Sequence, residues 1–343
     1  MSILRKRVSL AGGIAAAILS AMAGCAKDSS VDTSGIEKEY LEAWIGANHP
    51  GVSASGRGVY IIGDEPGSGA ELTSGDSYLF IEYTSTDLEG NVSSTTSKKL
   101  SQQVGSYNPT NYYGDYIIIN DETYTQLGIM DLLDGMRIGG KRVGVVPGWL
   151  NVTLNEYESK ATGSNTIYSI TLKDKTSDIT AWEIDTLSRY AAIHMPGIDS
   201  TMFGYYCKTQ KEPTSPDTFS ADTTFYINYT GRILGGQVFD TTVEDTAKVY
   251  GFYSPTKTYS PIKVTPSSDG DYTKTTIGAT SSSEGSTVVD GFAFCLSKLR
   301  PFEKVTCAFY SGLGYGYSGS GSAIPKFTPI VFDIEVVEEP SDE

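Results

Sequence analysis

The chain repeats the same turn and strand residues at a constant spacing, and this repeat is the strongest constraint on its fold. Three pairs of short motifs lie 146 positions apart: Pro50-Gly51 and Pro196-Gly197, Gly58 and Gly204, and Tyr83-Thr84 and Tyr229-Thr230. Two later pairs lie 164 positions apart: Gly148 and Gly312, and Tyr168 and Phe332. A constant spacing across several elements indicates a tandem duplication. A single large β-domain, the alternative, would not restart with the same residues. We therefore expect two copies of one fold, with an insertion in the second.

Each copy is expected to be a β-rich unit that begins with a helix. The 343 residues suffice for two domains, and the many Tyr (23) and Gly (37) residues favour strands and turns. Residues 37–47 have amphipathic spacing, and the chain restarts at Thr180 with a capping-box pattern before a second helical stripe. Further elements expected in the first copy are strands at 58–62, 78–84, 142–146 and 166–173 and a short helix at 128–135. The predicted fold class is α+β with antiparallel sheets.

The charge of the chain limits its partners. A net charge of −15 argues against nucleic acid, because phosphate binding needs a basic surface. It also disfavours contact between the folded part and anionic lipid. The acidic residues 339–343 are expected to form a solvated tail.

The N-terminus has the features of a bacterial lipoprotein signal. A basic segment, Arg5-Lys6-Arg7, precedes an apolar run that is too short to span a membrane well. Small residues lead to Cys25, as in the lipobox whose cysteine is acylated, with palmitate among the chains. An ordinary signal peptide or a short membrane anchor is the alternative. By analogy with the familiar sorting rule, Ala26 after the cysteine predicts the outer membrane. Whether the protein faces the periplasm or the exterior stays open.

The other cysteines and the histidines do not predict a metal or a catalytic triad. Cys207, Cys295 and Cys307 lack metal-ligand spacing, and buried apolar positions suit them better than a disulfide framework. The two histidines, His49 and His194, are far apart in the sequence. Zinc and a Ser/His/Asp site are therefore disfavoured, and no cofactor is expected.

Residues 229–242 predict a strand, a tight turn and a second strand. Phe225, Ile227 and Tyr229 alternate with smaller or polar residues, Gly235-Gly236 suits a hairpin turn, and Phe239 is followed directly by Asp240. A carboxylate beside aromatic rings at a strand end suggests a binding pocket, or catalysis by environment rather than by a nucleophile.

From this hairpin to the end, the second copy resembles the FKBP-type peptidyl-prolyl isomerases. The motifs that carry the resemblance are Tyr229-Thr230-Gly231, Val238-Phe239-Asp240, Val288-Val289-Asp290-Gly291-Phe292, Glu303-Lys304-Val305-Thr306, Tyr315-Gly316, Ala323-Ile324-Pro325 and Val331-Phe332-Asp333-Ile334-Glu335-Val336. The match covers about residues 201–337. It implies two tandem FKBP-like domains, each an antiparallel sheet wrapped on a short helix and preceded by an extra N-terminal helix. The family helix would run to about Leu299.

The resemblance also implies the site residues. The expected catalytic residues are Tyr229, Phe239, Asp240 and Tyr315, and the expected substrate-binding residues are Ile262, Val288, Val289, Phe292, Ile324 and Phe332. The Tyr315 hydroxyl and the Ile324 N–H would hold substrate carbonyls. Phe292 replaces the family's pocket-floor tryptophan, and Phe302 stands where a turn glycine is usual. The 241–287 stretch is longer than usual in the family, and its residues 267–287, rich in Ser, Thr and Gly, are expected to form a loop near the pocket rim.

The first copy lacks the pocket chemistry. At the spacing of the repeat, Ser93-Ser94 replaces Phe239-Asp240, Asn151 stands opposite Tyr315, and Lys160 stands opposite Ile324. Tyr83, Ile129 and Tyr168 remain as wall residues. This copy is therefore expected to be non-catalytic, with a role in docking, dimerisation or client holding.

The sequence thus predicts an envelope lipoprotein that isomerises X–Pro bonds in proline-containing exported polypeptides. The expected segments are a signal peptide at 1–24, a flexible tether at 25–35, a degenerate FKBP-like domain at 36–175, an isomerase domain at 176–338 and the tail at 339–343. The alternatives are a non-catalytic chaperone or binding lipoprotein with FKBP-like folds, and a surface glycan-binding lipoprotein.

Overall fold

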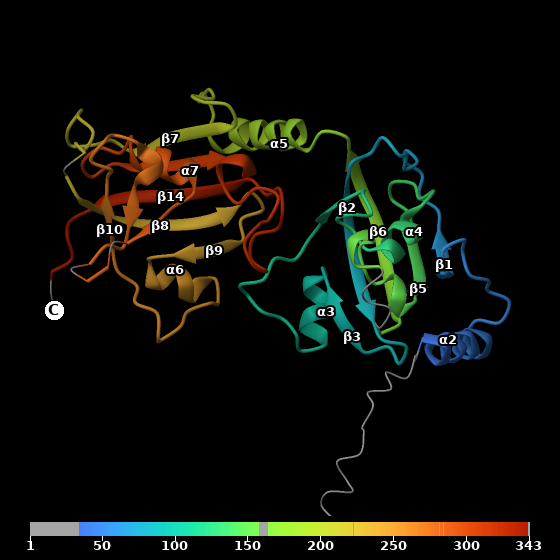
Figure 1. Cartoon of the computed structure of the whole chain (residues 1–343). Coiled ribbons are helices and arrows are strands. Elements are labelled where there is room, and N and C mark those ends of the chain that lie inside the picture. Colours follow the sequence, from blue (N-terminus) through green and yellow to red (C-terminus); the bar gives the residue numbers. More distant parts are fainter. Residues whose placement is uncertain (1–33, 158–163, 222, 281, 284, 342–343) are drawn as a thin grey trace, which may run out of the picture.

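A computed structural model describes residues 34–157, 164–221, 223–280, 282–283 and 285–341. Cys25, the predicted signal peptide and nearly all of the predicted tether lie outside the described residues. None of the described helices is long and apolar enough to cross a bilayer. We call residues 34–176 the first half and residues 179–337 the second half, and Figure 1 shows each as a sheet with short helices.

The first half forms a mixed structure of one antiparallel sheet and short helices. In chain order its elements are α2 (Ser34–Asn48), β1 (Tyr60–Glu65), β2 (Tyr78–Thr86), β3 (Val92–Thr95), α3 (Lys98–Gln103), β4 (Tyr116–Ile119), α4 (Leu127–Leu133), β5 (Lys141–Val146), the 3-10 turns η1 (Gly148–Leu150) and η2 (Leu154–Glu156), and β6 (Thr166–Thr176). The strand order is β1-β5-β6-β2-β3, and β4 also pairs with β2. Helix α2 begins at Ser34, so it includes the last two residues of the predicted tether.

The second half follows the same plan. Its elements are α5 (Ile179–His194), β7 (Tyr205–Lys211), β8 (Phe225–Ile233), β9 (Val238–Thr241), α6 (Glu244–Val249), β10 (Ile262–Thr265), η3 (Tyr272–Lys274), β11 (Thr276–Ile277), β12 (Ser286–Thr287), α7 (Asp290–Leu296), β13 (Lys304–Phe309), η4 (Ser311–Leu313) and β14 (Ile330–Val337). The strand order is β7-β13-β14-β8-β10-β11-β12, and β9 also pairs with β8.

The element order and the strand order recur between the halves. Strands β3 and β9 begin 146 positions apart, as do β4 and β10, whereas α4 and α7 begin 163 positions apart. Residues 120–126 connect β4 to α4, but residues 266–289 connect β10 to α7. The extra residues therefore all follow β10. They were expected to form a loop, but β11 and β12 instead add two short strands to the sheet edge.

Local sequence explains why α7 packs closely on the sheet. Phe292 and Leu296 are buried on the sheet, and the helix ends at Leu296 rather than at the predicted Leu299. Gly291 permits this packing, because a Cβ there would lie 2.5 Å from the ring of Phe309 on β13. Side-chain contacts in cores are seldom that close, so α7 and β13 require a residue without a side chain at this point.

An apolar contact joins the two halves. Phe80 of β2 lies 4.5 Å from Trp182 of α5, measured between ring centroids, and Phe327, which precedes β14, lies 5.1 Å from Tyr78. Phe80 and Phe327 are both buried in this contact. No sequence pattern predicted this contact, because its residues come from distant segments that share no periodicity.

The cysteines of the second half are packed as apolar residues. Cys295 and Cys307 are buried, Cys207 is half-buried, and none of the three is in a disulfide. Cys207 on β7 lies opposite Cys307 on β13. Within the described part of the chain, no group of His, Cys, Asp and Glu side chains is arranged to hold a metal ion.

Candidate functional site

The predicted site residues of the second half converge on one apolar cluster. Its buried members are Phe292, Ile324 and Phe332, and its half-buried members are Tyr229, Phe239, Ile262, Val288, Val289 and Tyr315. These residues come from six segments: β8, β9, β10, the start of α7, residues 314–329, which we call the flap, and β14. The sheet therefore brings together residues that are separated by up to about a hundred positions in the sequence.

Aromatic rings form the centre of this cluster. The centroids of Phe292 and Phe332 are 4.4 Å apart, Tyr229 lies 5.5 Å from Phe292, and Phe239 lies 5.7 Å from Phe332. Gly231 on β8 faces Phe332 on one side and pairs with Asp240 on the other. A Cβ at Gly231 would lie 2.5 Å from Phe239 and 2.8 Å from Phe332. The glycine of the Tyr229-Thr230-Gly231 motif thus makes room for the two rings.

Asp240 is fixed at the edge of the rings. Its Oδ2 accepts a hydrogen bond of 2.6 Å from the Tyr229 hydroxyl, and its Oδ1 accepts one of 2.9 Å from the N–H of Thr241. Burial and the adjacent Asp240 carboxylate raise the pKa of Tyr229 far above its ordinary value. Tyr229 therefore stays protonated and acts as a donor at every physiological pH.

Sequence reasoning missed Lys257. Its ammonium lies 2.6 Å from Oδ1 of Asp240, and it also lies over the ring of Tyr259. Lys257 stands in an irregular segment between α6 and β10, where no periodicity places a side chain. The Asp240 carboxylate therefore has three partners, and only about a third of its side chain is exposed (38%).

The flap before β14 differs from expectation at Ile324. The Ile324 N–H was expected to hold a substrate carbonyl, but it donates to the Ser320 carbonyl at 3.1 Å. The Ser320 N–H donates back to the Ile324 carbonyl at 2.8 Å, which closes a small loop. Gly319 is required there, because it has a φ of +64° and a Cβ would lie 2.3 Å from the Ile324 carbonyl oxygen. Ile324 thus contributes a buried side chain rather than a free donor.

The Tyr315 hydroxyl is exposed to the negative charge of Asp240. Burial and the negative charge of Asp240 raise the pKa of the Tyr315 hydroxyl above its ordinary value. The hydroxyl therefore remains a donor. Ile262 pairs with Ile227 across β10 and β8, and Val289 immediately precedes α7, so both form walls of the apolar cluster.

A loop of the first half lies against the rim of this cluster. The Tyr112 N–H donates to the Ser322 carbonyl at 2.7 Å, and the side chain of Gln237 donates to the Asn111 carbonyl at 2.7 Å. The Tyr112 ring packs against the cluster, and burial raises its pKa to about 12. Contacts between the halves thus reach the hairpin turn and the flap that border the candidate site.

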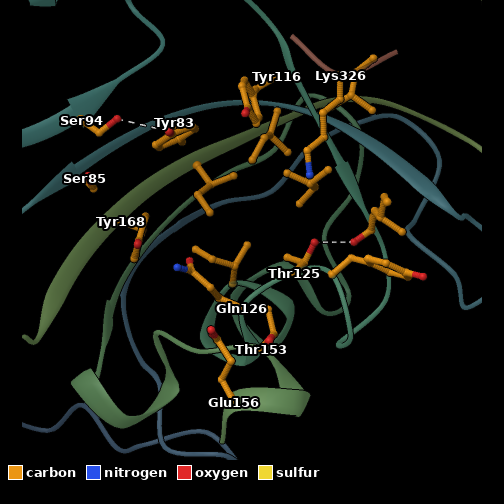
Figure 2. A pocket seen from close by; sticks show the side chains of 17 residues that line it. Tyr83, Ser85, Ser94, Tyr116, Thr125, Gln126, Thr153, Glu156, Tyr168 and Lys326 are labelled. Atoms are coloured by element: carbon orange, nitrogen blue, oxygen red, sulfur yellow. Dashed lines mark hydrogen bonds between the residues drawn. The ribbon is translucent and has the colours of Figure 1, made fainter. Parts of the chain in front are cut away.

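The first half has a cavity at the position equivalent to the site. The three predicted wall residues, Tyr83, Ile129 and Tyr168, all line one cavity of about 420 Å³ (Figure 2). At the position of Asp240 stands Ser94, whose hydroxyl is 3.2 Å from that of Tyr83. Asn151 donates to the Ser164 carbonyl, and Lys160 lies outside the described residues.

Comparison with known proteins gives distant structural likenesses. No protein-family model matches the sequence, and no curated protein is significantly similar to it. The chain is similar to the structure of the three FKBP domains of wheat FKBP73, with 12% identity and a TM-score of 0.28 over 82% of this chain and 95% of that one.

Two bacterial structures are similar to parts of the chain. A peptidyl-prolyl cis-trans isomerase from Pseudomonas syringae is 20% identical, with a TM-score of 0.30 over 46% of this chain and 93% of its own. FkpA from Escherichia coli is 18% identical, with a TM-score of 0.32 over 47% of this chain and 59% of its own.

Proposed function

We propose that the chain consists of two tandem FKBP-like domains and that the second isomerises X–Pro bonds in exported polypeptides. The first domain, in this proposal, has no isomerase activity. The recurrence of element order and strand order between the halves supports the duplication. The aromatic cluster, with the Asp240 carboxylate hydrogen-bonded to Tyr229 at its edge, supports the activity.

The observation that carries the proposal is the hydrogen bond between Tyr229 and Asp240 at the edge of the aromatic cluster. An X–Pro bond rotates slowly because amide resonance gives it double-bond character, with a barrier of roughly 18–20 kcal/mol. The twisted amide has lost that resonance, and its carbonyl is less polar than in the planar form. An apolar, aromatic surface therefore binds the twisted form better, and this differential binding lowers the barrier.

Each side chain has a distinct part in this mechanism. The proline ring would lie on Phe292, between Tyr229, Phe239 and Phe332, because these rings form the apolar surface. Asp240 would supply a fixed charge beside the rotating carbonyl, and the Tyr315 hydroxyl would donate to a substrate carbonyl. Ile324 would act as a wall only, because its N–H already has a partner. No proton transfer is needed in this mechanism.

We further propose that a lipid on Cys25 anchors the protein in the bacterial envelope, at the outer membrane. The lipobox sequence before Cys25 supports this assignment. Replacing Cys25 with alanine is expected to move the protein from the membrane fraction to the soluble fraction after cell lysis. Retention of Cys25→Ala in the membrane fraction would contradict the anchor.

The test of the activity is a protease-free isomerisation assay with the full chain and a fluorescent proline peptide. We expect catalysis that falls several-fold in Tyr315→Phe, because one hydrogen bond is worth about 0.5–1.5 kcal/mol. Asp240→Ala is expected to fall further, because a charged group is lost. Absent catalysis, or catalysis unchanged in both variants, would contradict the proposal.

A second function, peptide binding without turnover, is favoured by one observation. Asp240 is already paired with Lys257, and this ion pair reduces the field that the carboxylate exerts on a substrate. If the full chain retards aggregation of an unfolded protein but does not speed isomerisation, the binding function is correct. Activity in the peptide assay that is lost in Asp240→Ala would exclude it as the sole function.

A further inference from the structure

The cavity of the first half is bordered by both halves of the chain. Its floor and walls come from β2, β4, β6 and α4, but one lining residue, Lys326, belongs to the flap of the second half. Figure 2 shows the Lys326 side chain entering from above, with its amine directed into the space. The cavity volume of about 420 Å³ falls within the range of small-molecule and peptide side-chain sites.

Isoleucine side chains line the interior of this cavity, and tyrosine side chains lie around them. Ile81, Ile117, Ile129 and Ile170 are buried and line it. Tyrosine hydroxyls and the hydroxyls of Ser94, Thr125 and Thr153 add polar contacts around that apolar surface. Such a lining suits a ligand with an apolar body and one polar end.

Lys326 supplies the charge for that polar end. Among the described residues, its ammonium forms no ion pair, although it is half-buried. The next residue, Phe327, is buried against Tyr78 of the first half, so the backbone beside Lys326 is held in place. Glu156 lies at the opposite end of the cavity in Figure 2. A carboxylate bound here is therefore oriented toward Lys326 and away from Glu156.

The two halves differ in the charge that they present at equivalent positions. The second half places the Asp240 carboxylate beside Tyr229, whereas the first half places the neutral Ser94 beside Tyr83. In addition, the first-half cavity gains the ammonium of Lys326. The field at the Lys326 end of this cavity thus favours an anion.

We propose that this cavity is a binding site for an apolar group that carries a carboxylate, with Lys326 as the counter-ion. Two sources offer that chemistry: the C-terminal residue of a polypeptide and a free aryl or alkyl carboxylic acid. The site needs both halves of the chain, and it does not depend on isomerase activity in the second half.

The test is calorimetric titration of the full chain with 4-phenylbutyrate and with its neutral amide. We expect the acid to bind at least about tenfold more tightly than the amide, because only the acid carries a negative charge that can pair with the Lys326 ammonium. Lys326→Met should remove that difference, and Lys326→Arg should keep most of it. Equal affinities for acid and amide, or an unchanged acid affinity in Lys326→Met, would overturn the proposal.

A blocking variant and a matched control locate the binding. Ser94 is exposed at the cavity wall, so Ser94→Trp should weaken binding of both probes without unfolding the protein. Lys257→Met, which removes the lysine of the other site, should leave the acid affinity unchanged. If Lys257→Met weakens binding and Ser94→Trp does not, the probe occupies the second half and the proposal is wrong.

Two peptides distinguish a polypeptide C-terminus from a free carboxylic acid as the source of the carboxylate. One ends in Leu-Phe with a free carboxylate, and the other is the same peptide with a C-terminal amide. Tighter binding of the free peptide than of 4-phenylbutyrate would assign the site to polypeptide C-termini. Binding of 4-phenylbutyrate alone would assign it to small carboxylic acids. If neither acid binds more tightly than its amide, the site is not an anion site.

Discussion

The Tyr229 hydroxyl donates a 2.6 Å hydrogen bond to Oδ2 of Asp240, while the equivalent hydroxyls of Tyr83 and Ser94 lie 3.2 Å apart. The strands that hold these pairs correspond at the same spacing of 146 positions. Asp240 in the second half therefore places a fixed charge at the edge of an aromatic cluster, where Ser94 in the first half makes only a neutral contact. This difference underlies the separate functions that we propose for the two halves.

Gly231 should not tolerate a side chain. In Gly231→Ala, the new Cβ would clash with Phe239 at 2.5 Å and with Phe332 at 2.8 Å. Overpacking of this kind costs about 1–3 kcal/mol, and the displaced rings would also disturb substrate binding. Chemical denaturation measures the loss of stability. Gly235→Ala is the control, because no atom lies within 4 Å of its added Cβ. Equal stability of the two variants would contradict the packing.

Glu183 should make stability fall as the pH rises. It is buried on α5, and both carboxylate oxygens accept hydrogen bonds of 2.7 Å from Ser311. Burial nevertheless raises the pKa of Glu183, so the folded protein holds this proton more tightly than the unfolded chain does. Its contribution is complete below the ordinary carboxyl pKa of about 4.3 and is lost as the pH rises through the raised value.

Glu183→Gln should reduce this pH dependence, because the amide does not ionise. Denaturant unfolding between pH 4 and pH 8 measures it. Asp185→Asn on the same helix is the control, because Asp185 is 67% exposed and should not alter the slope. A wild-type stability that rises across this range, with no change of slope in Glu183→Gln, would show that Glu183 is not the responsible group.

Phe302 and Phe327 should respond in opposite directions to replacement by glycine. Both have left-handed backbone conformations, with φ values of 59° and 53°. Phe302 is 37% exposed, so Phe302→Gly should relieve strain and stabilise the protein by up to about 1 kcal/mol. Phe327 is buried against the first half, so Phe327→Gly should destabilise it by about 2–4 kcal/mol. Thermal unfolding measures both changes, and two shifts of the same sign would contradict this assignment.

Features with local sequence patterns were predicted well. The alternation in β8 placed Phe225, Ile227 and Tyr229 on one face, and the repeat located the equivalent strands of the first half. The family resemblance placed the end of α7 at about Leu299, but the helix ends three residues earlier, at Leu296, although Leu299 is also buried. A helix end depends on backbone hydrogen bonds that apolar spacing does not reveal.

Features that depend on distant contacts were not predictable. Lys257 reaches Asp240 from an irregular segment, and Lys326 reaches the cavity of the other half. The N–H of Ile324 is taken by Ser320, four residues earlier, in a small closed loop. The short strands β11 and β12 come from Ser- and Thr-rich sequence that resembles a loop. In each case the pairing partner, rather than the local pattern, determines the structure.

The most direct test of the account is the isomerisation rate of Asp240→Ser, which gives the second half the side chain of Ser94. We predict that kcat/KM for a proline peptide falls at least about tenfold, because the charged hydrogen bond is worth about 1.5–3 kcal/mol. The unfolding midpoint should change little, since the serine hydroxyl remains within reach of Tyr229. An unchanged kcat/KM in a folded Asp240→Ser variant would contradict the proposed role of Asp240 and, with it, the function assigned to the second half.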